Sequence, residues 1–117
     1  MTELRLVGLR TIPEIRPGDD LGAMIAEAAG RESLPLEDGD ILVVTQKVVS
    51  KAENQLVDIE TIEPSPFAIS IAERFNKDAR RVEVVLRESR RIVRMDRGIL
   101  ITETHHGFIC ANSGVDE

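Results

Sequence analysis

Polar side chains that could bind a phosphate group follow an apolar run near the middle of the chain. Residues 39–53 read GDILVVTQKVVSKAE, and the wholly apolar run 41–44 predicts a buried strand. The polar side chains at its exit are Gln46, Lys47, Ser50 and Lys51. Lysine is a flexible point charge suited to phosphate oxygens, while glutamine and serine add directional hydrogen bonds. The pattern predicts either a phosphate site or a solvated strand end at which lysines protect the sheet edge.

Acidic pairs mark two further positions. Asp116 follows Gly114 in a turn, where a carboxylate can point into a cleft and bind a hard cation such as Mg²⁺. An ordinary surface turn explains Asp116 equally well. Asp19 and Asp20 precede a segment with helical periodicity, and acids are typical of a helix N-terminus. Asp116 is therefore the candidate metal ligand of the two pairs.

A histidine pair with a nearby cysteine gives little support for zinc. His105 and His106 are adjacent, and neighbouring side chains of a strand point to opposite faces, so both seldom bind one metal. A turn or a packed histidine is the better interpretation. Cys110 lies between Ile109 and Ala111 and is expected to be a small buried residue.

Hydrophobic periodicity predicts a mixture of strands and short helices. Strands are predicted over residues 3–9, 41–49, 56–59, 92–95, 99–104 and 108–111. Helices are predicted over residues 21–29, ending at Gly30, then from Pro66 with Ser65 as N-cap, and then after Asp78. Because these elements do not alternate as βαβ units, the pattern favours an α+β fold with a mixed sheet and short helices.

The third predicted helix has two distinct faces. Val82, Val85, Leu86 and Ser89 share an inner face at helical spacing. The outer face is expected to be solvated, with the charged residues Arg80, Arg81, Glu83, Arg87 and Glu88.

Composition restricts the class of protein. The 117 residues are 42% hydrophobic and 31% charged, as in one soluble domain or part of one. A net charge of −6 and the lack of a basic run argue against a nucleic-acid partner. One cysteine allows no intrachain disulfide, and no apolar run is long enough for a membrane span, so we expect a cytoplasmic protein without a membrane partner. The motifs GxxxxGK[ST] and GxGxxG are absent.

Five blocks in order resemble one enzyme family. They are IPEI at residues 12–15, RPGDDL, DGDILVVTQKVVSKAE, VEVVLRES and HHGFICANSGVD. Together they resemble the coenzyme F420:L-glutamate ligases, also called F420-0:γ-glutamyl ligases, from about Leu6 to the last residue. The resemblance implies that residues 1–117 are the N-terminal portion of this ligase fold.

The resemblance implies an activity. Members of the family join L-glutamate to the γ-glutamyl tail of coenzyme F420, with GTP, Mg²⁺ or Mn²⁺, through an acyl phosphate. The implied small molecules are F420-0 or F420-1, L-glutamate and GTP, with K⁺ as a further candidate cation. A cytoplasmic homodimer is the implied assembly.

The resemblance also assigns roles to residues. The segment Ile12, Pro13, Glu14 and Ile15 and the side chains of Gln46, Lys47 and Lys51 match the family's nucleotide contacts. Asp116 matches the aspartate of the family's NAGVD block, a divalent-metal ligand, although position 113 is serine where alanine is usual. No residue matches a catalytic acid or base that we can name.

Family members run about twice as far as this sequence, so we expect a fragment of a longer chain that is inactive by itself. The alternative is a non-catalytic module that keeps the fold and nucleotide binding and serves as a scaffold.

Overall fold

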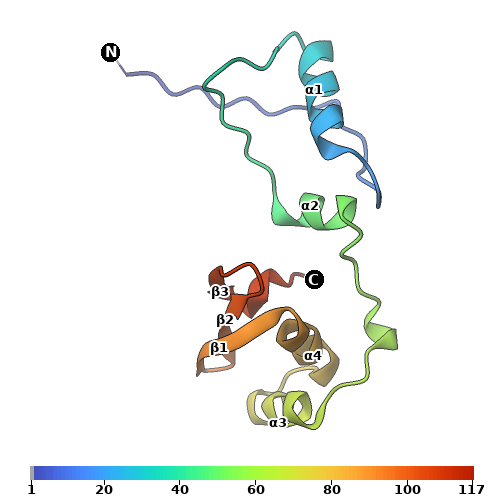
Figure 1. The fold of residues 1–117 in the computed structure, drawn as a ribbon, viewed down its shortest axis with the longest axis vertical. Helices are drawn as coiled ribbons and strands as arrows, with labels where there is room; N and C mark the ends of the chain where they lie inside the picture. The colour runs from blue at the N-terminus through green and yellow to red at the C-terminus, as the bar shows by residue number, and fades with distance from the viewer. Residues whose placement is uncertain (1) are drawn as a thin grey trace. The chain divides into compact units, whose positions relative to one another are not determined.

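The computed structural model describes residues 2–117 and has an α+β fold, as the sequence predicts (Figure 1). The described residues contain four α-helices and one three-stranded sheet. They form two compact units, which divide between Leu56 and Val57, and each unit is described by itself. Along the described residues, no helix reaches the length and apolar content that crossing a bilayer requires.

The first unit contains α1, Leu21–Arg31. Asp20 is its N-cap, and the Asp20 carboxylate accepts a hydrogen bond from the Ala23 amide at 3.0 Å. The apolar face of α1 buries Ile25, Ala28 and Ala29. The prediction that Gly30 ends the helix is wrong, because α1 continues to Arg31 and Glu32 is the C-cap.

The predicted strand over 41–49 is wrong in its second half. Gln46–Ala52 forms the helix α2, and the Thr45 hydroxyl accepts from the Val48 amide at its N-terminus. Val48 and Val49 suggest a strand by propensity, but a threonine cap and the flanking helix formers Gln, Lys and Ala favour the helix.

The first half of that predicted strand, residues 41–44, and two further predicted strands are wrong as well. Residues 41–44 and 3–9 lie in no strand of the described chain. The predicted strand over 56–59 is replaced by the 3₁₀ turn Ile59–Thr61, in which the Asp58 carboxylate accepts from the Glu60 amide at 3.0 Å. A strand needs a neighbour for its backbone groups, and apolar sequence alone does not supply one.

The second unit contains two α-helices whose N-caps the sequence predicts correctly. In α3, Pro66–Phe75, Ser65 caps the N-terminus and Pro66 occupies the first turn. In α4, Ala79–Arg87, the Asp78 carboxylate accepts from the Arg80 amide at 2.9 Å. Hydrogen bonds from Arg80 lower the pKa of Asp78 to about 2.

The sheet of the second unit consists of β1, Ser89–Asp96, β2, Ile99–Thr104, and β3, Ile109–Ala111. The strands are antiparallel in the order β1-β2-β3, which confirms the three strands predicted in this part of the chain. Arg97 and Gly98 both have positive φ, 49° and 80°, as a tight hairpin turn requires.

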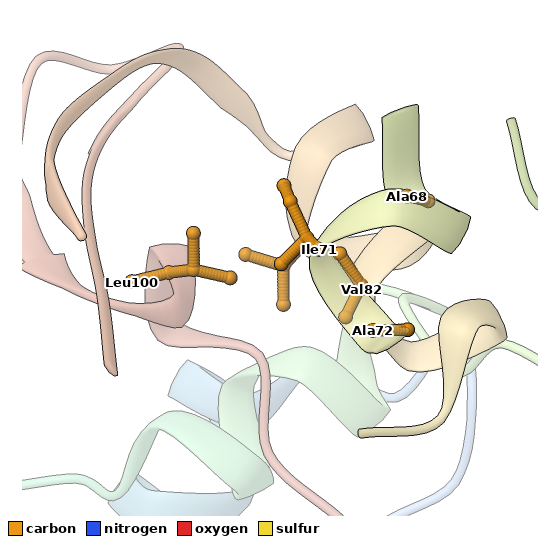
Figure 2. Close-up of a cluster of buried hydrophobic side chains, with 6 residues drawn as sticks. Ala68, Ile71, Ala72, Val82 and Leu100 are labelled. Carbon is orange, nitrogen blue, oxygen red and sulfur yellow. The ribbon is translucent and has the colours of Figure 1, made fainter. Parts of the chain in front are cut away.

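The core of this unit lies between the sheet and the two helices. Its buried members are Ala68, Ile71, Ala72, Val82, Val85 and Leu100. Figure 2 shows Leu100 of β2 pointing toward Ile71 of α3 and Val82 of α4. Alternation along β2 places Leu100 and Thr102 on this inner face, where both are fully buried.

The predicted solvated face of α4 is wrong at Glu83, which is buried. Its Oε1 accepts from the Ser65 amide at 2.7 Å, and its Oε2 accepts from Arg87 Nε at 3.0 Å. Hydrogen bonds from Ser65 hold the pKa of Glu83 below its ordinary value of 4.5, and the hydrogen bond from Arg87 lowers it further. A carboxylate from α4 therefore satisfies a backbone donor at the start of α3, which explains why it can be buried.

We predict that Glu83→Gln lowers the free energy of unfolding by about 1–3 kcal/mol at pH 7, because charge-assisted hydrogen bonds are lost. A lowered carboxyl pKa adds stability above pH 4.5, and that stability disappears as the pH falls through the folded-state pKa. Urea unfolding at pH 7 and at pH 3 should show a smaller difference between the two proteins at pH 3. Glu73→Gln, on the exposed side of α3, is the control. An equal deficit at both pH values would contradict this account.

Candidate functional site

The predicted nucleotide contacts all lie in the first unit, and the structure brings two of their segments together. Lys51, in the last turn of α2, forms an ion pair with Glu14 of the 12–15 segment. A second link joins these regions, because the Gly18 amide donates to the Ala52 carbonyl at 2.9 Å. Residues 37 positions apart in sequence are thus in direct contact at this place.

The ion pair is unequal in exposure. The side chain of Lys51 is 25% exposed, whereas that of Glu14 is 79% exposed, and the neighbouring Ile15 is buried. The hydrogen bond from Lys51 lowers the pKa of Glu14, so this carboxylate is charged at neutral pH. Glu14 can leave Lys51 for solvent at little cost, and an anionic ligand could take its place.

Helical spacing, and not a strand exit, groups the polar side chains of α2. Positions i and i+4 share a helix face, so Lys47 and Lys51 lie one turn apart on one side and Gln46 and Ser50 on the next. Gln46 and Lys47 are exposed, and Ser50 is half-buried. Two ammonium groups one turn apart on a helix are suited to a ligand with more than one phosphate group.

A small pocket lies beside the 12–15 segment. It has a volume of about 250 Å³ and is lined by Thr11, Pro13, Met24, Glu27 and Arg31. Sequence reasoning did not predict a pocket at these residues, because the pocket forms only where α1 meets the segment that precedes it in the sequence. No spacing motif signals such a contact.

Two residues at the end of α1 hold the wall of this pocket. The Glu32 carboxylate accepts from the amides of Arg10 at 3.0 Å and Thr11 at 3.3 Å, and from the Thr11 hydroxyl at 3.0 Å. Arg31 donates to the Thr11 carbonyl at 2.9 Å. Backbone hydrogen bonding from Arg10 lowers the pKa of Glu32. The chain is therefore held by side chains just before the 12–15 segment, at residues 10–11, and within the segment, at Glu14.

Asp116, the candidate metal ligand, lies in the second unit and is exposed. Its neighbour Glu117 pairs with Arg81 of α4 at 2.5 Å. Among the residues that the structure describes, no group of three or more His, Cys, Asp or Glu could hold a metal ion. A divalent cation such as Mg²⁺ takes six ligands, so a site at Asp116 would need further ligands beside this carboxylate.

A chain of hydroxyl groups holds the turn that leads to Asp116. The Ser89 hydroxyl donates to the Val85 carbonyl at 2.6 Å, so it must accept from Ser113, whose oxygen is 2.6 Å away. Ser113 has then used its proton, and it accepts from Thr102 across 2.7 Å. The Ser113 amide in turn donates to Thr102 at 2.7 Å.

The hydroxyl chain stabilises a backbone conformation that serine rarely adopts. Asn112 and Ser113 have φ values of 53° and 51°, in the left-handed region. The buried Thr102 hydroxyl receives the Ser113 amide and so compensates for the cost of this conformation. Sequence reasoning did not identify Thr102, because a threonine inside a strand has an ordinary structural explanation.

We predict that Thr102→Val, which has nearly the same shape, destabilises the second unit by about 1–3 kcal/mol, because the Ser113 amide loses its buried acceptor. Thr102→Ser keeps the hydroxyl and is the matched control. Urea unfolding gives the stability, and amide hydrogen exchange at Ser113 reports the hydrogen bond directly. Unchanged exchange at Ser113 in Thr102→Val would show that the hydroxyl does not hold the turn.

The histidine pair forms the predicted turn. His105 and His106 lie between β2 and β3, and His105 Nε2 is 2.7 Å from the Arg87 carbonyl at the end of α4. His105 is exposed, and this contact ties the turn to the helix. Cys110 is half-buried, and its backbone carbonyl lies 3.3 Å from the Thr102 hydroxyl.

Comparison with known proteins finds the same family that the five sequence blocks resemble. The family described as F420-0:Gamma-glutamyl ligase matches residues 8–117. The coenzyme F420:L-glutamate ligase of Methanopyrus kandleri is 53% identical over 104 residues, which are 89% of this chain and 39% of that protein. The ligase of Methanothermobacter thermautotrophicus is 43% identical over 114 residues, 97% of this chain and 45% of the relative. The chain spans less than half the length of these curated relatives.

Proposed function

Since this chain belongs to the F420-0:γ-glutamyl ligase family, we propose that the protein that carries it ligates L-glutamate to the γ-glutamyl tail of coenzyme F420. The family match over residues 8–117 is the observation that carries this proposal. The contact between Glu14 and Lys51 further supports this proposal. The contact joins the 12–15 segment to α2, and the proposal assigns GTP to both.

The proposed reaction forms an amide bond at the expense of GTP. A carboxylate of the F420 tail attacks the γ-phosphorus, which releases GDP and leaves an acyl phosphate. The amino group of glutamate then attacks the acyl carbon, phosphate departs, and the nitrogen loses a proton. Mg²⁺ or Mn²⁺, when bound, would neutralise charge on the phosphate oxygens.

The residues of α2 would orient the nucleotide. Lys47 and Lys51 supply positive charge on one face, and Gln46 adds a hydrogen-bonding group at the start of the helix. Glu14 would hold the Lys51 ammonium in place before GTP arrives and give it up to a phosphate oxygen. The segment Ile12–Ile15, held at Glu14 and at the preceding residues 10–11, would form an adjoining wall of the same site.

We predict that Lys51→Ala weakens GTP binding by more than tenfold, or about 1.4 kcal/mol, because a phosphate loses its charged partner. Isothermal titration calorimetry on the native protein that carries this chain gives the affinity. Lys77→Ala, an exposed lysine in the second unit, is the control and should bind GTP normally. An unchanged affinity in Lys51→Ala would contradict the nucleotide assignment.

Asp116 is the residue that we propose as a ligand of the divalent cation, with K⁺ as a further candidate cation of the site. We predict that Asp116→Asn abolishes Mn²⁺-dependent ligation and leaves the melting temperature unchanged, because an amide oxygen carries no charge and Asp116 is exposed. Glu117→Gln, whose carboxylate is engaged by Arg81, is the matched control and should retain activity. Assays with GTP, Mn²⁺, glutamate and the deazaflavin acceptor measure turnover.

The same assay applied to the 117-residue chain by itself should show no ligation, because the described residues do not group enough ligands for a tight cation site. Ligation by this chain, or normal turnover by Asp116→Asn, would contradict the proposed role of Asp116.

A further inference from the structure

The Glu32 carboxylate satisfies three hydrogen-bond donors of residues 10–11. Both of its oxygens lie 3.0 Å from the Arg10 amide, and Oε2 also accepts from the amide and the hydroxyl of Thr11. In the described chain, residues 10–15 lie in no helix or strand, so their backbone donors depend on side chains or on water. Glu32 therefore supplies the acceptors that a neighbouring strand would otherwise provide.

Arg31 holds Thr11 as well. Its Nη2 group donates to the Thr11 carbonyl at 2.9 Å and to the Thr11 hydroxyl at 3.3 Å. The hydroxyl gives its one proton to Glu32 across 3.0 Å, so a lone pair of the same oxygen accepts from Arg31. The amide, the carbonyl and the hydroxyl of Thr11 are thus all engaged by two consecutive residues at the end of α1. We call the contacts of Arg31 and Glu32 with residues 10–11 the α1 clamp.

The position of Glu32 is unfavourable for a carboxylate by local rules. Glu32 is the C-cap of α1, and the C-terminal end of a helix carries partial negative charge, which repels an acid. Hydrogen bonding from the Arg10 amide lowers the pKa of Glu32, so a contact outside the helix keeps this carboxylate charged. The Glu32 side chain therefore stabilises residues 10–11 and not its own helix.

The next two residues transmit the position of the α1 clamp to Glu14. Proline fixes its own φ and favours an extended conformation of the residue before it, so Ile12 and Pro13 form a stiff link. Beyond this link, Glu14 pairs with Lys51, and Ile15 is only 6% exposed. The segment is thus anchored to α1 before it begins and to α2 at Glu14.

The two anchors differ in their response to the proposed nucleotide. A phosphate that binds Lys51 displaces Glu14 and so removes the anchor at α2. The α1 clamp is made without Lys51 and stays in place when this ion pair opens. We propose that Glu32 is a positioning residue for GTP, which keeps the 12–15 segment ordered while Glu14 releases Lys51. The inference rests on the proposed function, because it takes GTP as the ligand of this segment.

Loss of Glu32 should lower the affinity for GTP. Without their acceptors, residues 10–11 gain conformational freedom, and GTP must then order them as it binds. We expect Glu32→Ala to raise the dissociation constant of GTP about tenfold, because binding includes this ordering. The KM for GTP should rise likewise, while kcat and the KM for glutamate stay unchanged. The melting temperature should change little, because the buried apolar residues of the first unit do not include residues 10–11.

The test uses the native protein that carries this chain. Isothermal titration calorimetry gives the GTP affinity of the wild type, of Glu32→Ala and of Glu37→Ala. Glu37 is an exposed glutamate of the same unit outside the α1 clamp, so Glu37→Ala should bind GTP normally. Amide hydrogen exchange without GTP should be faster at residues 10–15 in Glu32→Ala, and GTP should slow it again.

A second pair of variants tests the same clamp with a smaller change. Thr11→Val removes the hydroxyl that joins Glu32 to Arg31 and should weaken GTP binding about threefold. Thr11→Ser restores the hydroxyl and should recover most of this loss. Because both positions act through one clamp, Glu32→Ala combined with Thr11→Val should lose less affinity than the product of the two single effects. Fully independent effects would overturn the inference.

The remaining outcomes separate this inference from the proposed function. Normal GTP binding by Glu32→Ala, with weakened binding by Lys51→Ala, overturns the inference and leaves the proposed function standing. Faster exchange at residues 10–15 with an unchanged GTP affinity gives Glu32 a structural role only, and unchanged exchange in Glu32→Ala removes the α1 clamp itself; each result overturns the inference. A wild-type protein that does not bind GTP contradicts the nucleotide assignment and this inference with it.

Discussion

The burial of one face of β2 is the constraint on which the second unit depends. Leu100 and Thr102 lie two residues apart on that face and are both fully buried, although one is apolar and the other carries a hydroxyl. Leu100 packs against α3 and α4, while the Thr102 hydroxyl must find partners inside the protein. It finds them in Ser113 and, through Ser89, in the carbonyl of Val85 on α4. One strand face thus determines both the packing of the helices and the path of the chain toward Asp116.

Polar contacts position the 10–15 segment of the first unit. The 10–11 backbone is held by Glu32, and the 12–15 segment meets α2 through Glu14 and Lys51. Exposed ion pairs and hydrogen bonds contribute little stability each, about 0–1 kcal/mol for a typical surface ion pair. Such contacts define a geometry and also yield readily to a competing ligand. This property suits a surface that is proposed to exchange a carboxylate for a phosphate.

The two units also differ in how far local pattern predicts them. In the second unit, caps, turns and strands agree with one another: Ser65 and Asp78 begin the helices, and Arg97-Gly98 makes the hairpin turn. In the first unit, residues 41–49 contain conflicting signals. The valines favour a strand, whereas the Thr45 cap and the helix formers Gln46 and Lys47 favour a helix. The helix is observed because it satisfies its own backbone groups, whereas a strand at this position has no neighbour in the described chain.

The sequence by itself determined the α+β class, the N-caps of α1, α3 and α4, the three strands between residues 89 and 111, and the family. These features depend on short-range periodicity, on side chains that bond to nearby backbone, and on residue identities. Only the tertiary structure decided that Glu83 is buried, that Thr102 holds the turn at Ser113, and that Glu14 contacts Lys51. Each of these joins residues 11 to 37 positions apart. Their partners depend on how elements pack, and no local pattern of charge or hydrophobicity encodes that arrangement.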